Sequence, residues 1–394
     1  MRKKNKKASQ QPVQQITTVQ RRDGFARQIT PKAISRARND VATWKAALKE
    51  FDSVDNPKRV KLITLYEDVM LDALLTSQIE QRIGRTLAAD FVLKNAAGAE
   101  DEDATRTLNE AVWFPDIIRY ILTSIFVGTT QIELTTNEQT GLSVTLLPAQ
   151  NFVPQKGVML YDVTSDKGLL YRETREFGTW VFEFGKPGDY GLLNKAIPHA
   201  LFKRFAQACW SELCEIYGIP PRFIKTNTQD PEMLDRAEAM LRDMGSAAYF
   251  IIDTTEEFEF AKGADTNGDV YNNLISLCNS EICLLISYAQ IGQDTRNGNR
   301  SKEEASIKLL EKAVKADKRL VEDYINSSVY PALVRIGVLP AGLRFSYKAE
   351  EDIAELWERT KSAMQYYEID PAWIKEKFNI AVIGPRNTSD GFFG

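Results

Sequence analysis

Histidine and cysteine are scarce in this sequence of 394 residues, which holds one histidine, His199, and four cysteines. A Ser-His-Asp triad would depend on His199, and no G-x-S-x-G motif supplies the serine. No cluster of Cys and His has the short spacing of a zinc site. The cysteines form the pairs Cys209/Cys214 and Cys278/Cys283. Five residues turn a helix through about 140°, so neither pair shares a face, and we predict reduced cysteines in an apolar core.

Long hydrophobic runs are also missing. No segment approaches the ~18 apolar residues that a membrane-spanning helix needs. The N-terminal residues 1–7, Met-Arg-Lys-Lys-Asn-Lys-Lys, lack the apolar centre of a signal peptide. We therefore expect no membrane association and a protein that stays in the cytoplasm where it is made.

Motifs for phosphate and calcium are incomplete. Gly185-Lys186-Pro187-Gly188 has the wrong glycine spacing for a P-loop or a dinucleotide fingerprint. The segment 265–269, Asp-Thr-Asn-Gly-Asp, has glycine at the fourth rather than the sixth position of a calcium loop, and its twelfth position is Ser276. We expect no metal and no cofactor at these two segments.

The net charge of −4 conceals a strong asymmetry. Residues 1–38 hold eleven Lys or Arg and one acid, about +10, and the remaining 356 residues hold 39 basic and 53 acidic residues, about −14. We predict a flexible basic arm over residues 1–30. Such an arm either contacts an anionic partner or serves as a solubilising tail.

The pattern over residues 31–195 predicts an α+β region. Helical periodicity extends over residues 60–87 and 105–126, with an interruption at Pro115. Alternating patterns predict short antiparallel strands over residues 130–134, 143–147, 152–154, 169–172 and 180–184.

A long helix and a small α/β module follow. Residues 198–217 are predicted to form a long helix that stacks apolar side chains on one face; they are Phe202, Phe205, Ala206, Cys209, Leu213 and Ile216. Gly218 and the prolines after it end the helix. Residues 222–261 then read as a β-α-β-β pattern, with strands at 222–226, 248–252 and 258–260 and a helix that begins at Asp230-Pro231.

The C-terminal third is predicted to be helical. Residues 270–291 are apolar nearly all round, which predicts a buried helix. A polar loop over residues 292–301 separates this helix from the next, which starts at the capping box Ser301-Lys302-Glu303-Glu304 and runs to about residue 326. Shorter helices are expected at 350–367 and 371–378, and residues 381–394 read as a loose tail.

This order of elements resembles the portal proteins of tailed bacteriophages, in particular those of Mu-like phages. Residues 205–221 carry the likeness, together with 286–292 before the polar loop and Val329-Tyr330-Pro331. The resemblance implies an α+β, largely helical fold with wing, stem, clip and crown. Its parts would be a wing at 31–195, stem helices at 196–221 and 262–291, a clip at 222–261, a tunnel-type loop at 292–301, and a C-terminal wing or crown region at 302–380.

The resemblance also implies a function, and it implies that the protein is not an enzyme. A ring of twelve subunits would occupy one capsid vertex of the virion after assembly in the host cytoplasm, and double-stranded DNA would pass through it non-specifically. Expected partners are terminase, capsid and scaffold proteins, and head-completion or tail-connector proteins. The implied DNA-facing residues are Gln293, Arg296, Asn297, Asn299, Arg300 and Lys302. The implied partner-binding residues of the clip are Arg222, Lys225, Asp230, Arg236, Tyr249 and Glu256.

Two other classes stay open from the residues alone. One is a different ring-forming head-to-tail adaptor without the clip module. The other is a nucleic-acid-processing enzyme, which the absence of phosphate and metal motifs disfavours.

Overall fold

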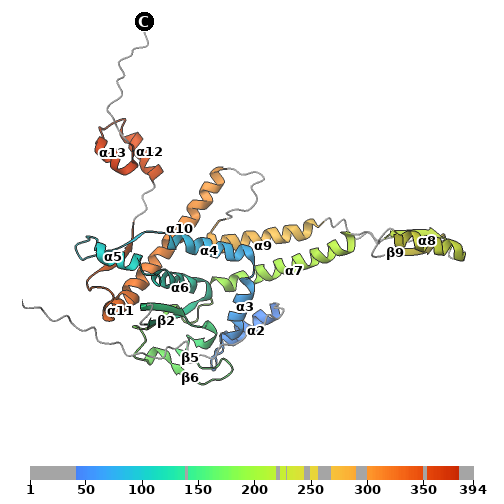
Figure 1. The fold of residues 1–394 in the computed structure, drawn as a ribbon, viewed down its shortest axis with the longest axis horizontal. Helices are drawn as coiled ribbons and strands as arrows, with labels where there is room; N and C mark the ends of the chain where they lie inside the picture. Colours follow the sequence, from blue (N-terminus) through green and yellow to red (C-terminus); the bar gives the residue numbers. More distant parts are fainter. Residues whose placement is uncertain are drawn as a thin grey trace, which may run out of the picture. The chain divides into compact units, whose positions relative to one another are not determined.

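The computed structural model describes residues 41–137, 141–218, 222–227, 229–243, 249–255, 268–289, 300–348 and 353–380. The chain divides into two units, Met1–Ser346 and Tyr347–Gly394. Helices dominate and short sheets accompany them, which confirms the α+β, largely helical class (Figure 1). Among the residues described, none of the helices combines the length and apolar character that crossing a bilayer requires.

Three helices open the described chain: α2 (Val41–Phe51), α3 (Val60–Val69) and α4 (Ala73–Leu87). The single helix predicted over 60–87 is therefore wrong, because the chain breaks between Val69 and Ala73. Asp72 causes the new start, since its carboxylate accepts hydrogen bonds from the backbone N–H groups of Leu74 and Leu75.

The predicted helix over 105–126 is also two helices, α5 (Glu102–Asn109) and α6 (Phe114–Val127). The break precedes Pro115 rather than falling at it. Proline has no N–H to lose in a first turn, and Pro115 lies in the first turn of α6. One side of α6 is buried and packs on β2.

The predicted antiparallel strands form two small sheets. In the first, β2 (Thr129–Asn137) pairs with both β3 (Gly141–Leu146) and β7 (Val181–Gly185). In the second, β4 (Phe152–Val153) and β6 (Gly168–Leu170) pair with β5 (Val158–Leu160), a strand that was not predicted. The strand predicted over 169–172 ends earlier than expected, because Tyr171–Glu173 form a 3-10 turn. A core cluster of Leu147, Phe152, Met159, Tyr171 and Val181 joins the two sheets.

The central helix, α7, spans Leu192–Gly218 and begins six residues before the predicted start at Pro198. Pro198 therefore lies inside the helix, where it removes one backbone hydrogen bond. The α/β module contains β8 (Arg222–Thr226), α8 (Pro231–Asp243) and β9 (Tyr249–Asp253), and the two strands are parallel. The third predicted strand, 258–260, lies outside the described residues.

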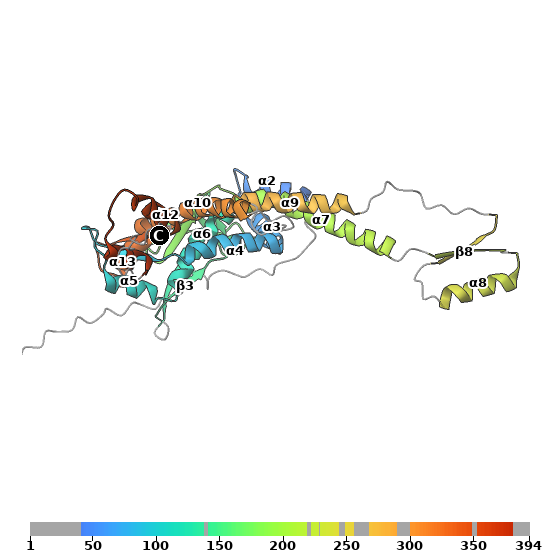
Figure 2. The ribbon, with the colours of Figure 1, turned by 90° about the horizontal axis from the view of Figure 1, so that it is seen from above.

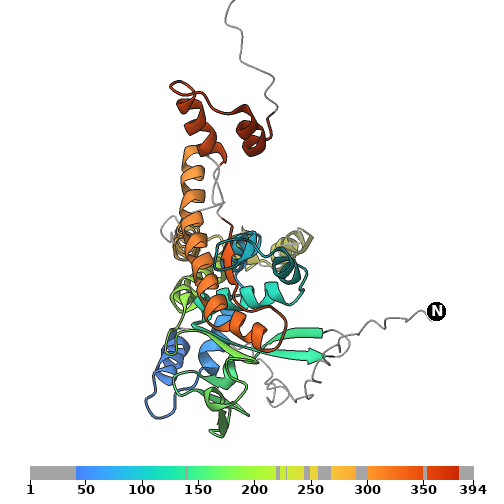
Figure 3. The ribbon, with the colours of Figure 1, turned by 90° about the vertical axis from the view of Figure 1, so that its left-hand side faces the viewer.

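The helix α9 (Asp269–Ser287) runs beside α7 (Figures 1 and 2). Next comes α10 (Arg300–Tyr324), the long orange helix in Figure 3. It starts one residue before the predicted capping serine, Ser301. A π-helical turn (Ile325–Val329) and α11 (Tyr330–Arg335) continue it past the predicted end at 326. Finally, β10 (Arg344–Tyr347) pairs with β1 (Phe91–Lys94).

The second unit contains α12 (Ile353–Ala363) and α13 (Pro371–Phe378). Phe378 lies with its ring centre 4.9 Å from that of Trp357 and 5.7 Å from that of Trp373. The two helices were predicted, although α12 is shorter than the expected 350–367. Residues 364–367 leave the helix as a turn.

Candidate functional site: an exposed helix pair

The helix α9 has one buried face and one exposed apolar stripe. The buried face carries Cys278, Ile282, Cys283 and Ile286. The opposite face carries Val270, Leu277 and Leu284, which are 61%, 57% and 45% exposed. These three residues are spaced by seven, which aligns them along one side of a helix. The predicted all-round burial of residues 270–291 is therefore wrong.

The neighbouring helix α7 also exposes apolar side chains. Phe202 and Phe205 are 47% and 58% exposed, whereas Ala206 is buried. The predicted apolar face of this helix is therefore partly exposed in the chain. Residues on other sides of α7 are buried instead; they are Ala196, Ile197, Ala200, Leu201 and Lys203. Two neighbouring helices thus each present large apolar side chains to solvent, which marks an interaction surface.

The cysteines of α9 and α7 differ in burial. Cys278 and Cys283 are buried, and burial raises the pKa of both thiols. Cys214 is exposed and Cys209 half-buried on α7, so the predicted core position is wrong for Cys214. All four are free thiols in this structure.

A buried ion pair anchors the end of α9. The Arg82 guanidinium on α4 donates from Nε and Nη2 to the two carboxylate oxygens of Asp317 on α10, at 2.7 and 2.8 Å. Its Nη1 donates to the carbonyl oxygen of Ile286 at 2.8 Å. Burial alone would lower the pKa of Arg82, but the hydrogen bonds and charge of Asp317 outweigh burial and raise it. The residue therefore stays charged and joins three helices.

A second pair of ionic contacts anchors α7. Lys203 is nearly buried, and its ammonium lies 2.8 Å from the carboxylate of Asp72, the residue that caps α4. The next residue, Arg204, lies 2.7 Å from the carboxylate of Asp68 and also donates to its carbonyl oxygen. These two contacts fix the middle of α7 against the end of α3 and the start of α4.

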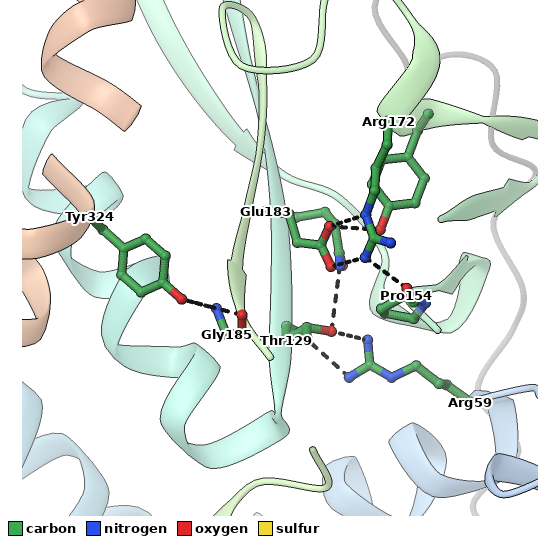
Figure 4. Close-up of polar contacts among 9 residues, drawn as sticks. Arg59, Thr129, Pro154, Arg172, Glu183, Gly185 and Tyr324 are labelled. Carbon is green, nitrogen blue, oxygen red and sulfur yellow. Dashed lines mark hydrogen bonds and ion pairs between the residues drawn. The ribbon is translucent and has the colours of Figure 1, made fainter. Parts of the chain in front are cut away.

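Further polar contacts connect the strands with neighbouring segments (Figure 4). Arg172 donates to both carboxylate oxygens of Glu183, each at 2.9 Å, and to the carbonyl oxygen of Pro154. The buried Arg59 donates to Thr129 through its hydroxyl and carbonyl oxygens, and burial lowers its pKa to about 10. Tyr324 accepts a hydrogen bond from the backbone of Gly185, which connects α10 to β7. These are structural contacts within the fold.

The structure describes some of the predicted clip residues. Lys225 and Arg236 are exposed. Asp230 caps α8 by accepting hydrogen bonds from the N–H groups of Glu232 and Met233, so its local role is structural. Arg222 and Tyr249 pair across β8 and β9 in the backbone register. Glu256 lies outside the described residues.

Most of the predicted DNA-facing residues lie outside the part of the chain that the structure describes. Gln293, Arg296, Asn297 and Asn299 lie outside the described residues, and their role stays a prediction. Arg300 and Lys302 belong to the first turn of α10, so the predicted loop over 292–301 is wrong at its last two residues. Across the described ranges, no group of three or more His, Cys, Asp or Glu is arranged to hold a metal ion.

Sequence reasoning missed the stripe on α9 and the buried ion pair. Val270, Leu277 and Leu284 are seven residues apart, and this spacing could have indicated the stripe. Other apolar residues of the same helix obscure it. For Arg82 and Asp317, which are 235 residues apart, no local pattern could have revealed the contact.

The chain is similar to a known protein family and to individual members of it. The family model described as portal protein of Mu bacteriophage matches residues 63–380. The Mu-like prophage FluMu protein gp29 of Haemophilus influenzae is 26% identical over 227 residues, which are 52% of this chain and 42% of that protein. The portal protein of Escherichia phage Mu is 27% identical over 207 residues, covering 50% of this chain and 40% of that protein. The matches thus span about two fifths of these relatives.

Two solved structures are distant neighbours. An HK97 family phage portal protein from Corynebacterium diphtheriae has a TM-score of 0.38 at 11% identity and covers 74% of this chain and 96% of its own. A chain from the neck of an empty GTA particle has a TM-score of 0.47 at 13% identity, with coverages of 80% and 93%. Neither score is high enough to establish a shared fold.

Proposed function

The chain belongs to the Mu bacteriophage portal protein family, and from this premise we propose that it forms a closed ring, expected to hold twelve subunits, at one vertex of a phage capsid. Double-stranded DNA passes through this ring during packaging and ejection. The role is structural rather than catalytic. The partners are terminase, capsid and scaffold proteins, and head-completion or tail-connector proteins. The ring assembles in the host cytoplasm and becomes part of the virion.

The exposed apolar stripe on α9 is the observation that supports ring formation. A ring that closes by rotation needs two different surfaces on each subunit, because each subunit contacts one neighbour on either side. The α9 stripe, with Val270, Leu277 and Leu284, offers one surface, and Phe202 and Phe205 on α7 offer another. Fully burying one such side chain contributes about 1.5–3 kcal/mol, so several of them in each contact offset part of the cost of association.

Native mass spectrometry of the full chain tests this proposal. Twelve copies of the 44.6 kDa chain weigh about 535 kDa. We expect a species of that size for the unaltered protein, and its replacement by much smaller species in Leu277→Glu, because the new carboxylate would be buried unpaired in the interface.

A matched control is Asn272→Glu, which adds the same charge at another exposed position of α9 that lies off the stripe. It should leave the large species intact. If Leu277→Glu assembles as well as Asn272→Glu, the stripe does not form the ring interface. If the unaltered protein is monomeric together with capsid and scaffold proteins, ring formation itself is wrong.

A further inference from the structure

An apolar groove lies beside α3, α4 and α6, apart from the helix-pair surface. Its volume is about 680 Å³, and its lining includes Ile63, Met70, Ile79, Ile83, Phe126 and Leu147. Leu146, at its rim, is 41% exposed. This volume is large enough for several apolar side chains, and no described element fills it.

One carboxylate in the wall, that of Glu67, has no cationic partner among the described residues. Glu67 accepts hydrogen bonds from the Gln150 side-chain amide at 3.1 and 3.3 Å, and burial raises its pKa. Within the described residues Glu67 has no ion pair, whereas the other wall carboxylate, Glu80, is paired with Arg119 at 2.8 Å. A cation placed at Glu67 would relieve the cost of burying this charge. The groove thus suits a segment that carries both apolar and cationic side chains.

Residues 25–38 of the same chain have this composition. The apolar residues are Phe25, Ile29 and Ile34, and the cations are Arg27, Lys32, Arg36 and Arg38. The described chain starts at Val41, close to the groove, because the Trp44 indole donates to the Asn194 side chain at 2.8 Å and the adjacent Leu193 lines the groove. A stretch of ten extended residues before Val41 spans up to about 33 Å. Residues 25–38 can therefore reach the groove of their own subunit.

We propose that residues 25–38 bind in this groove of their own subunit, with apolar side chains in the cavity and a lysine or arginine paired with Glu67. This inference goes beyond the ring function and does not depend on it. It gives the basic arm a specific binding site, in place of a general role as an anionic-partner contact or a solubilising tail.

Limited trypsin digestion of the full chain, followed by mass spectrometry, tests the proposal. Trypsin cleaves after Arg27, Lys32, Arg36 and Arg38 only when the segment leaves the groove, and cleavage then follows the open population. Glu67→Lys should speed cleavage at these four sites by about tenfold or more, because like charges repel. Cleavage after Arg2 to Lys7 provides an internal reference that should not change.

The matched control is Glu110→Lys, which reverses an exposed carboxylate at the end of α5, away from the groove. Its digestion should equal that of the unaltered protein. Equal cleavage rates at residues 27–38 in Glu67→Lys and Glu110→Lys would overturn the proposal, provided that cleavage within α10 shows both variants folded.

Cysteine crosslinking keeps the proposal testable if Glu67→Lys unfolds. Ile34→Cys and Ala149→Cys are introduced together in a chain in which Cys209 and Cys214 are replaced by serine. A disulfide within one chain, seen by non-reducing electrophoresis and peptide mapping, supports the proposal because it requires Cα atoms within about 7 Å. A disulfide-linked dimer, which would place a neighbour's arm in the groove, or no disulfide at all overturns it. Val112→Cys, 89% exposed and away from the groove, replaces Ala149→Cys as the control.

Discussion

Three glycines allow close backbone contacts between residues 126–128 and residues 185–191, just before α7. Gly128 has a φ of +88°, and a Cβ at this position would lie 2.0 Å from the carbonyl oxygen of Asp189. A Cβ at Gly185 would lie 2.0 Å from the carbonyl oxygen of Gly128, and one at Gly191 would lie 2.3 Å from that of Phe126. Side chains cannot occupy such spaces, so the entry of the chain into α7 depends on these glycines. The sequence predicted a strand over residues 130–134, just after Gly128, but not the close approach of the backbone.

Alanine at Gly128 should destabilise the first unit strongly. We expect Gly128→Ala to lower the free energy of unfolding by about 3 kcal/mol or more, because backbone atoms must move in addition to the strain of positive φ. The matched control is Gly98→Ala, at a φ of +83° with no atom within 4 Å of the added Cβ. It should cost only about 1–2 kcal/mol. Urea unfolding of both variants measures the difference, and equal losses would show that φ strain alone matters.

At the scale of elements, charged residues hold the helices that apolar packing alone would leave free to slide. Arg82 on α4 contacts both Asp317 on α10 and the carbonyl oxygen of Ile286 on α9. Its guanidinium also lies 5.7 Å from the ring centre of Phe126 on α6 and 5.5 Å from that of Tyr288, just after α9. A hydrophobic contact tolerates small translations, whereas a two-point arginine–carboxylate contact fixes one register. The exposed stripe of α9 is therefore presented at a defined position.

Removing Arg82 alone should lower the free energy of unfolding far more than removing both Arg82 and Asp317. Arg82→Met leaves Asp317 buried without its cation, and we expect a loss of about 3–5 kcal/mol in unfolding free energy. Arg82→Met combined with Asp317→Leu should recover most of this loss, because no uncompensated charge remains. Thermal and urea unfolding measure both. A double variant as unstable as the single one would mean that the bond to Ile286, rather than the ion pair, stabilises the three helices.

Helices and strands were predictable where periodicity is strong, and their boundaries were not. The breaks before Ala73 and Phe114 depend on a capping carboxylate and on a proline in a first turn, which were present in the sequence but outweighed by continuous apolar patterns. The exposure of Phe202 and Leu277 could not be predicted from one chain's pattern. Apolar periodicity shows that a face will be covered, but it does not distinguish the protein's own core from a neighbouring subunit.

At the scale of the whole molecule, the charge distribution agrees with the proposed role as a channel for DNA. Residues 39–394 carry about −14, so the bulk of the chain does not attract phosphates strongly. Each phosphate that a protein neutralises adds salt-dependent affinity, and strong binding would oppose sliding. The basic residues 1–38 are the exception, and their proposed binding to the groove near Glu67 would keep part of this charge away from passing DNA.

Deletion of residues 222–261 separates ring formation from partner binding. The module's described part is a parallel strand pair, β8 and β9, with α8, and the apolar stripe on α9 lies outside the deleted range. We expect the deleted chain, joined by a short Gly-Ser linker, to form a ring with the same number of subunits in native mass spectrometry and to lose terminase in co-purification.

Reversal of the exposed charges in Lys225→Glu with Arg236→Glu should weaken terminase binding without the deletion, whereas reversal of Glu80 on α4, outside the module, should not. A ring that still retains terminase after the deletion would assign docking to another surface, and a deleted chain that no longer assembles would show that the module takes part in the ring contacts.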